Sequence, residues 1–259
     1  MDNMITYDYK NHCVLVTGSS RGVGRATALA FARAGARVCV HYHRNEEKAR
    51  ELLAELPGNG HALLRADLAK PAAVRVLVES AIAKLGRLDV LVNNAGIFEP
   101  HPVDGDLDFD AWLAAWQRTL DVNLTGAAAA AYTAARHMMA RGRGGCIINI
   151  GSRGAYRGEA GQPGYGAAKA GLHALSQSLA QGLGQYGITV HAVAPGFIET
   201  ALARPWLQGA AGEAVRAQSP LNRVATVEEV AQAVLYLASE EARFTTGAVL
   251  DLNGASHLR

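Results

Sequence analysis

Two side chains that could carry proton chemistry lie close together in the second half of the chain. Tyr165 and Lys169 are four residues apart in a segment with helical spacing, so both lie on one face of the expected helix. A phenol ionises near pH 10, and ionising it at pH 7 costs roughly 4 kcal/mol. A nearby ammonium group would lower that cost. The pair predicts a tyrosine acid/base, although the same spacing also occurs by chance on exposed helices.

Ser152 adds a hydroxyl group to the same region. It lies thirteen residues before Tyr165 and just beyond the apolar run Cys146–Ile150, which is typical of a buried strand. In an open parallel sheet, ligands bind at the carboxyl ends of the strands, which is where Ser152 would lie. The joint pattern is much rarer than its parts, and it predicts a site at that edge of the sheet.

A glycine-rich turn follows the first strand-like run and leads directly into a helical pattern. Its residues are Thr17-Gly18-Ser19-Ser20-Arg21-Gly22-Val23-Gly24. Glycines let the backbone turn sharply and approach a pyrophosphate, and the helix N-terminus offers free N–H groups. The turn therefore favours a dinucleotide site. Its spacing, G-x-x-x-G-x-G, differs from the commoner G-x-G-x-x-G, and an ordinary strand-to-helix turn is the alternative.

The end of the second strand-like run indicates which dinucleotide would bind. A site for NAD carries an Asp or Glu there for the ribose 2′-hydroxyl, and the segment Val40–Asn45 contains no acid. Arg21, His43 and Arg44 would instead surround the 2′-phosphate of NADP, because arginine offers a fixed charge and a fork of donors. The alternative is a solvated basic loop. We expect NADP(H) to be preferred over NAD(H).

The elements that would position these residues alternate along the chain. Seven short, mostly continuous apolar runs are typical of strands covered on both faces: Cys13–Val16, Arg37–Val40, His61–Arg65, Leu88–Val92, Cys146–Ile150, Thr189–Val193 and Val249–Leu252. Helical spacing predicts helices at Gly24–Ala34, Glu46–Leu56, Ala72–Leu85, Leu124–Ala140, Gly166–Gln185 and Val227–Ser239. This order predicts an α/β fold, a doubly wound Rossmann domain with a seven-stranded parallel sheet and helices on both faces.

No linker, repeat or low-complexity tract divides the 259 residues, so we expect a single domain over residues 1–259. The stretch Phe197–Val224 lacks clear periodicity and contains Pro205, Trp206 and Pro220. It is either a long connection or, as loops of this length often are, a lid. We expect a substrate lid at about residues 197–224.

Composition argues against several classes of protein. The balance of 25 Lys and Arg against 23 Asp and Glu argues against a nucleic-acid binder. The N-terminal residues lack the features of a signal peptide. The longest mostly apolar segment, Gly126–Ala135, is shorter than the roughly 20 residues needed to cross a bilayer. We therefore expect a cytoplasmic protein with no membrane or nucleic-acid partner.

The cysteines and histidines do not indicate a metal site. Cys13, Cys39 and Cys146 each lie in a strand-like run, and we expect buried free thiols. His41 and His43 are spaced to share one face of a strand, but no carboxylate or third ligand accompanies them. No metal is expected.

Further short motifs follow in a fixed order. They are Asp67-Leu68, Asn93-Asn94-Ala95-Gly96, Asn123 within Val-Asn-Leu, and Pro195-Gly196 with Thr200. Together with the glycine turn, Ser152 and Tyr165-x-x-x-Lys169, they make the sequence resemble the short-chain dehydrogenase/reductase family in its common form of about 250 residues. The resemblance runs from about Lys10 to Gly254.

The resemblance implies a hydride-transfer site. Tyr165 would be the general acid in reduction and the base in oxidation, and Ser152 would hydrogen-bond the same substrate oxygen. Lys169 would bind the nicotinamide ribose and favour the tyrosinate, and Asn123 would link Lys169 through water to a proton relay. The hydride itself would belong to the cofactor.

The resemblance also assigns cofactor contacts. It implies that Gly18, Gly22 and Gly24 meet the pyrophosphate, Asp67 and Leu68 the adenine, Asn94, Ala95 and Gly96 the adenosine ribose, and Ile198 and Thr200 the carboxamide. We further expect contacts from Ser20, Arg21, Val23, His43, Arg44, Asn45, Pro195 and Gly196. Asn93 and Asn123 also satisfy backbone groups in family members, and Asp67 would alternatively cap a helix.

The substrate is less constrained. The sequence is most similar to 3-oxoacyl-(acyl-carrier-protein) reductases, which implies a small-molecule ketone and secondary alcohol. Sugar or polyol, steroid and pteridine reductases of the family, and a catalytically silent dinucleotide sensor, are the alternatives. The run His41–Arg44 is similar to the NADP-binding segment of pteridine reductases, but those carry an aspartate where Ser152 stands, which disfavours a pterin.

The candidate pocket residues are Phe98, Glu99, His101, Arg153, Tyr156, Arg157, Gln162, Phe197, Leu202 and Trp206. Arg153 and Arg157 would either contact an anionic substrate or be solvated. The segments Gly126–Ala135 and Gly166–Ala174 are rich in small residues, and the corresponding helices form a subunit interface in the family. A homotetramer is expected, although helices buried within one chain would look the same.

Overall fold

The centre of the protein is a seven-stranded parallel sheet, in a computed structural model that describes residues 7–201 and 203–259. The strand order is β3-β2-β1-β4-β5-β6-β7, and each neighbouring pair is parallel. The strands are Cys13–Val16 (β1), Arg37–Tyr42 (β2), Ala62–Arg65 (β3), Val90–Asn93 (β4), Gly145–Ile150 (β5), Ile188–Pro195 (β6) and Val249–Leu252 (β7). The order reverses between β1 and β4, and a crevice for ligands opens at such a point.

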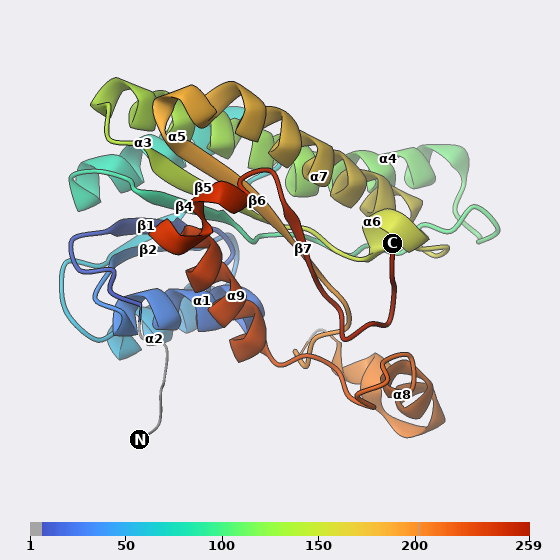
Figure 1. The fold of residues 1–259 in the computed structure, drawn as a ribbon. Coiled ribbons are helices and arrows are strands. Elements are labelled where there is room, and N and C mark those ends of the chain that lie inside the picture. Colours follow the sequence, from blue (N-terminus) through green and yellow to red (C-terminus); the bar gives the residue numbers. More distant parts are fainter. Residues whose placement is uncertain (1–6, 202) are drawn as a thin grey trace, which may run out of the picture.

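Helices cover both faces of the sheet (Figure 1). On one face lie α1 (Gly22–Arg33), α2 (Glu46–Glu55) and α9 (Val227–Ala238), and on the other lie α3 (Pro71–Leu85), α5 (Gly126–Arg141) and α7 (Pro163–Leu183). Alternate residues of β1 enter different cores, since Val14 and Val16 pack with the first group and Cys13 and Leu15 with the second. The strands are buried on both faces, which explains their continuous apolar runs. The predicted doubly wound fold is confirmed.

The predicted strands and helices are present, with ends shifted by at most three residues, but three helices were not predicted. They are α4 (Phe109–Leu120), α6 (Gly154–Arg157) and α8 (Gly209–Arg216). The sequence does carry a signal for α4, since Phe109, Trp112, Leu113, Trp116 and Leu120 recur at helical spacing and Asp108 caps the helix by accepting from Ala111 N, and the prediction missed it.

The remaining elements are short. A π-helical segment, η1 (Asp121–Thr125), joins α4 to α5, and 3-10 segments occur at η2 (Gly184–Tyr186), η3 (Arg204–Leu207) and η4 (Glu240–Thr245). The stretch 197–224 is therefore not an irregular connection, since it contains η3 and α8. In Figure 1, α8 stands apart from the sheet and its flanking helices.

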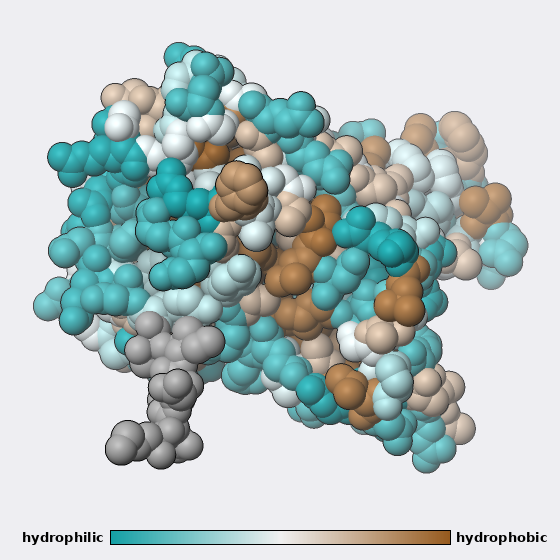
Figure 2. All heavy atoms as spheres, viewed as in Figure 1, coloured by the Kyte–Doolittle hydropathy of each residue, from teal (hydrophilic) through white to brown (hydrophobic). Residues whose placement is uncertain are grey.

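The edge strand β7 leaves hydrophobic side chains partly exposed. Val249, Leu250 and Leu252 are only half-buried. Figure 2 shows hydrophobic groups gathered near this strand. Among the described residues, no helix combines the length and the apolar character that a membrane span requires, and no three metal-ligating side chains cluster. Cys13, Cys39 and Cys146 are free and buried, as predicted.

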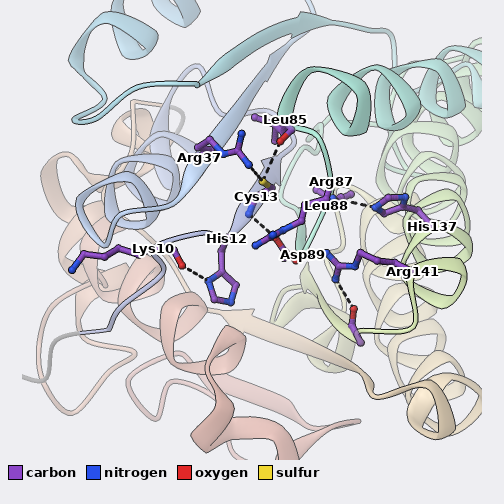
Figure 3. Close-up of polar contacts among 11 residues, drawn as sticks. Lys10, His12, Cys13, Arg37, Leu85, Arg87, Leu88, Asp89, His137 and Arg141 are labelled. Carbon is purple, nitrogen blue, oxygen red and sulfur yellow. Dashed lines mark hydrogen bonds and ion pairs between the residues drawn. The ribbon is translucent and has the colours of Figure 1, made fainter.

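The amino ends of the strands are tied together by the carboxylate of Asp89 (Figure 3). Its Oδ2 accepts hydrogen bonds from Cys13 N at 2.8 Å and from Arg87 Nε at 2.8 Å, and its Oδ1 pairs with Arg141 of α5. Burial alone would raise the pKa of Asp89, but the hydrogen bonds from Arg87, Arg141 and Cys13 N outweigh it and hold the pKa below its usual value. The network joins β1, the start of β4 and α5 at the edge opposite the strands' carboxyl ends.

Asp89→Asn should lower the free energy of unfolding by about 3 kcal/mol, because two guanidinium groups lose their counter-charge. The exposed pair Asp251–Arg259 supplies the control, and Asp251→Asn should cost less than about 1 kcal/mol. Since the folded pKa of Asp89 is depressed, its contribution is present above the unfolded pKa near 4 and disappears as the pH falls through the folded value. Urea unfolding at pH 7 and pH 3 measures both effects. Equal losses in the two variants at pH 7 would contradict this account.

Candidate active site

Tyr165 and Lys169 lie one turn apart on α7, as predicted. Lys169 Nζ lies 5.6 Å from the centroid of the Tyr165 ring. Lys169 is only 4% exposed, and its Nζ donates a hydrogen bond of 2.6 Å to the carbonyl oxygen of Ile150, the last residue of β5. Among the described residues no carboxylate forms an ion pair with Lys169, and burial lowers its pKa to about 8. A charged group is thus held at the carboxyl edge of the sheet by a strand carbonyl.

Ser152 follows β5, and its hydroxyl lies close enough to the phenol of Tyr165 to lower the pKa of that phenol. The Ser152 hydroxyl accepts a hydrogen bond from Gly154 N at 3.0 Å, which fixes its position. Burial has the largest effect on Tyr165 and raises its pKa, the Ser152 hydroxyl lowers it, and the carboxylate of Glu159 raises it. The net pKa is raised, so the phenol keeps its proton at neutral pH. The lowering expected from Lys169 does not appear, because burial dominates and the ammonium group is bonded to Ile150.

Asn123 lies in the π-helical segment η1, close to Lys169. Its Oδ1 accepts a hydrogen bond from Ile97 N at 2.8 Å, and its Nδ2 donates one to Ile97 O at 2.9 Å. A Cβ placed on Gly96 would lie 3.3 Å from Asn123 Oδ1 and 3.7 Å from Lys169 Nζ. Asn123 therefore has the backbone-satisfying role considered above, and it fixes the loop after β4 beside the lysine.

An aromatic contact joins Tyr165 to the stretch 197–224. The ring of Phe98 lies 4.9 Å from that of Tyr165 and 5.8 Å from that of Trp206, both edge-on. Phe98 follows the Asn93–Gly96 turn, and Trp206 lies in η3. These two predicted pocket residues are thus brought to the phenol from different parts of the chain.

His101, another predicted pocket residue, makes hydrogen bonds to the backbone of the protein. His101 is fully buried, with Nδ1 at 2.7 Å from Glu99 O and Nε2 accepting from Gly164 N at 3.0 Å. The Glu99 carboxylate pairs with Arg118. His101 thus ties the loop before α4 to the start of α7, and it was missed as a structural residue because its partners are backbone groups.

The remaining candidates differ in their surroundings. Tyr156 stacks against His257 and beneath Arg259, whose guanidinium carbon is 4.5 Å from the ring centroid. Arg157 is exposed. Gln162 is buried, and its Oε1 has no hydrogen-bond partner within residues 7–201 and 203–259, which leaves an unused acceptor three residues before Tyr165. Leu202 lies outside the described residues.

The glycine turn packs directly against the Asn94–Ala95 turn. Gly18 has φ +64°, and a Cβ there would lie 2.9 Å from Ala95 Cα. A Cβ on Gly24 would overlap the amide nitrogen of Asn94. Thr17 Oγ1 accepts from Asn94 N at 3.0 Å and from Ala95 N at 3.1 Å, while Asn94 Nδ2 donates to Thr17 O at 2.8 Å. The two turns therefore form one unit at the crevice between β1 and β4.

The N-terminus of α1 fits an anionic group. Its N-cap residue is Arg21, which makes no capping hydrogen bond from its side chain, and the first turn contains no acidic residue. Its first N–H groups and the positive end of the helix dipole remain available. A Cβ on Gly22 would lie 3.7 Å from Thr200 Cγ2, so Thr200 stands across from the turn. Gly18, Gly22, Gly24 and Thr200 surround a cradle suited to a dinucleotide pyrophosphate.

The end of β2 presents basic side chains. Arg21, His43 and Arg44 are exposed, and the side chains of both arginines are free of hydrogen bonds and ion pairs to other described residues. His43 Nε2 lies 4.0 Å from Asp67 Oδ1. Asn45 Oδ1 accepts from Lys48 N at 3.0 Å and caps α2, so part of its side chain is already engaged.

Asp67 does not cap α3, whose N-cap residue is Lys70. Its Oδ1 accepts instead from Ala69 N at 3.1 Å. Leu68 is buried, Pro195 ends β6, and Gly196 follows it and donates from its N to Leu252 O at 3.0 Å. These residues, with Ser20 and Ile198, lie at the carboxyl edge of the sheet or in the loops that follow it, and Val23 lies buried in the first turn of α1.

His41 is a site residue that was considered above as a metal ligand and as part of the run His41–Arg44, but not as an acceptor for the glycine turn. Its Nδ1 accepts a hydrogen bond from Gly18 N at 3.0 Å, and its Nε2 donates one to Ala66 O at 3.2 Å. Burial lowers its pKa to about 4, so the ring is neutral and both nitrogens are occupied. His41 joins the glycine turn to the residue before Asp67. A polar residue inside an apolar strand was the signal that could have shown this role.

His41→Phe should raise the dissociation constant of NADPH about tenfold or more, because Gly18 N–H loses its acceptor and the turn loses its position. His61→Phe is the matched control: His61 accepts from Val38 N at 3.1 Å and lies 3.0 Å from Pro57 O, but at the other end of the strands. Fluorescence titration with NADPH measures both. Equal losses of affinity in the two variants would show that the effect is one of general stability.

The sequence is similar to one family profile and to several oxidoreductases along nearly its whole length. The sequence profile described as "Enoyl-(Acyl carrier protein) reductase" matches residues 18–257. The chain is 39% identical to cis-4-hydroxycyclohexanecarboxylate dehydrogenase of Sinomonas cyclohexanicum, covering 95% of this chain and 96% of that protein. It is 38% identical to 3-oxoacyl-(acyl-carrier-protein) reductase of Escherichia coli strain K12, over 97% and 99%. It is 36% identical to L-rhamnose 1-dehydrogenase (NAD(P)(+)) of Sphingomonas sp. strain SKA58, over 95% and 96%.

Proposed function

This chain belongs to the short-chain dehydrogenase/reductase family, whose members are oxidoreductases acting on CH–OH groups, and we propose that it interconverts a 3-oxoacyl thioester and its secondary alcohol with NADP(H). The observation that carries the proposal is the convergence of three groups at the carboxyl end of β5. The Ser152 hydroxyl lies near enough to the Tyr165 phenol to lower its pKa, and Lys169 Nζ lies 5.6 Å from the centroid of the phenol ring.

The proposed chemistry follows from the protonation states. A bound nicotinamide supplies the hydride. Ser152 and Tyr165 donate hydrogen bonds to the carbonyl oxygen, and Tyr165, whose pKa is raised by burial, gives its proton to that oxygen as negative charge develops. Lys169, with a pKa of about 8, is largely protonated at pH 7 and stabilises the resulting phenolate. In oxidation, Tyr165 takes the proton back.

Proton return is the role we propose for Asn123. Its side chain is bonded to both backbone groups of Ile97, which fixes the amide in place with one donor and one acceptor site engaged. The π-helical geometry of Asp121–Thr125 leaves the backbone of this turn as the water-binding group. Such a water would lie between the turn and Lys169.

The substrate is the least constrained part of the proposal. The relatives' names cover an acyl thioester, a cyclic hydroxy acid and a sugar. Phe98 and Trp206 supply an aromatic wall beside Tyr165, and the unused Oε1 of Gln162 supplies an acceptor. NADPH oxidation with a panel of 3-oxoacyl thioesters, cyclic keto acids, ketoses and steroid ketones tests the assignment. The highest kcat/KM should belong to a 3-oxoacyl thioester, and a tenfold preference for another class would reassign the substrate.

Tyr165→Phe should lower kcat at least about 100-fold while the dissociation constant of NADPH changes less than about threefold, because a positioned general acid contributes that much. Tyr156→Phe is the control, since that ring is stacked on His257. Stopped-flow reduction and fluorescence titration separate the two quantities. A Tyr165→Phe variant with normal turnover would place the proton donor elsewhere. A wild-type protein that binds NADPH and reduces no ketone would favour the dinucleotide sensor.

The cofactor preference rests on Arg21, His43 and Arg44. Arg44→Asp should lower the ratio of kcat/KM for NADPH to that for NADH by a factor of about 10 to 100, the value of a charge-assisted hydrogen bond. Lys48→Asp makes the same change of charge one turn into α2 and should alter the ratio less than threefold. Steady-state rates with both cofactors measure this. Equal shifts in the two variants would mean that net charge, and not a contact with the 2′-phosphate, sets the preference.

We also propose a homotetramer with residues 197–224 as a lid. Ala167, Ala170 and Ala174 are exposed along one face of α7, and Tyr132 of α5 is 68% exposed, which suits close packing of helices between subunits. The half-buried apolar groups of β7 suit a second interface (Figure 2). The base of the proposed lid is closed by a parallel bridge between Ile198 and Ala225.

A further inference from the structure

Arg153, the residue after Ser152, is a buried guanidinium that contacts three separate segments. It is 4% exposed. Its Nη1 donates to Ser256 Oγ, its Nη2 donates to Gln218 Oε1 at 2.7 Å, and its guanidinium carbon lies 5.1 Å from the ring centroid of Phe197. Its backbone N–H donates to Pro195 O at 3.0 Å. Arg153 is therefore not the solvated side chain that was one of the two alternatives above, since it is buried in the protein.

The charge of Arg153 is not balanced by a direct partner. In the described part of the chain no carboxylate forms an ion pair with it, and both recorded acceptors of its side chain are neutral oxygens. Burying a charge costs free energy unless hydrogen bonds compensate for it. An aliphatic side chain would fill this space without that cost. What the guanidinium of Arg153 adds over an aliphatic side chain is its pair of hydrogen bonds to Ser256 and Gln218.

The two lid-side contacts of Arg153 come from opposite ends of residues 197–224. Phe197 begins the segment, and Gln218 follows α8 near its end. The neighbour of Gln218 is tied to the same region, because Ser219 Oγ donates to Gly254 O at 2.6 Å. The guanidinium thus fastens both ends of the proposed lid to the loop that contains Ser152 and to the loop after β7.

Apolar packing alone does not fix this part of the lid. A cavity of about 330 Å³ adjoins the guanidinium, and Arg153, Phe197, Leu221 and Asn253 contribute to its walls. Beside this half-open pocket, the hydrogen bonds of Arg153 act together with the Ser219–Gly254 hydrogen bond and the Ile198–Ala225 bridge to hold the two ends of residues 197–224.

We propose that Arg153 is a positioning residue that latches residues 197–224 over the substrate side of the active site. The position of residues 197–224 affects the reacting groups through two aromatic contacts. The ring of Trp206 contacts that of Phe98, and the ring of Phe98 contacts that of Tyr165. Ser152 and Lys169 have anchors of their own, at Gly154 N and Ile150 O. Loss of the latch should therefore weaken substrate binding and spare the chemical step. The inference rests on the proposed function.

The test compares Arg153→Met with Gln218→Leu, which removes the acceptor from the other side. Each should raise KM for the ketone about tenfold, with kcat within threefold of wild type and the dissociation constant of NADPH within twofold. The losses in the double variant should be less than additive, since both single variants remove the same Arg153–Gln218 hydrogen bond. Arg153→Lys keeps the charge and one donor and should recover part of the loss. Arg157→Met removes the longer, exposed hydrogen bond of 3.3 Å to the same Gln218 oxygen, and it should raise KM less than Arg153→Met does.

Hydrogen exchange gives a readout that needs no turnover. Arg153→Met should speed exchange in both residues 209–219 and residues 253–257, and Arg157→Met in neither. The latch would be overturned by an unchanged KM, with or without a fall in kcat, or by additive losses in the double variant. Unaltered hydrogen exchange in both segments would overturn it as well. A wild-type protein that reduces no ketone with NADPH would instead refute the proposed function, and the exchange measurement would still decide whether Arg153 holds the lid.

Discussion

The burial of one ammonium group constrains the rest of the site. Lys169 is charged, almost inaccessible to solvent and without an acidic partner among the described residues, so it must be held by fixed dipoles. Ile150 O supplies one, at the end of β5. The loop after β4 approaches the same nitrogen, since a Cβ on Gly96 would lie 3.7 Å from it and 3.3 Å from Asn123 Oδ1. Strand end, helix face and loop are thereby brought together around one atom.

The proposed cofactor side is built by a second set of backbone contacts. Thr17, Asn94 and His41 join the glycine turn to the loops after β4 and β3, and each uses nearly all of its polar atoms to do so. Because these side chains bond to backbone, the crevice is shaped before any ligand binds. The exposed side chains of Arg21 and Arg44 differ, since they make no hydrogen bond or ion pair to other described residues and remain available to an anion.

The sequence predicted the sheet and its flanking helices because strands buried on both faces must be continuously apolar, as in β1 and β5. It also predicted that Ser152, Tyr165 and Lys169 lie together at the carboxyl edge of the sheet, because Ser152 directly follows a strand and ligands bind at that edge of a parallel sheet. The helix α8 was missed because its eight residues include two glycines and bury only Gly212, whereas α4 was missed although its apolar residues recur at helical spacing behind the N-cap Asp108. Nor did the sequence reveal the roles of His41, His101 and Arg153, because their partners are backbone groups or residues distant in sequence, and spacing carries no record of such contacts.

A crystal structure of the protein with NADP⁺ and a secondary alcohol tests the central claim most directly. The account predicts that the alcohol oxygen lies within about 3 Å of both the Tyr165 phenol oxygen and Ser152 Oγ, with Lys169 Nζ on the nicotinamide ribose hydroxyls. A complex in which the nicotinamide lies away from Tyr165, with Lys169 still bonded to Ile150 O alone, would contradict it.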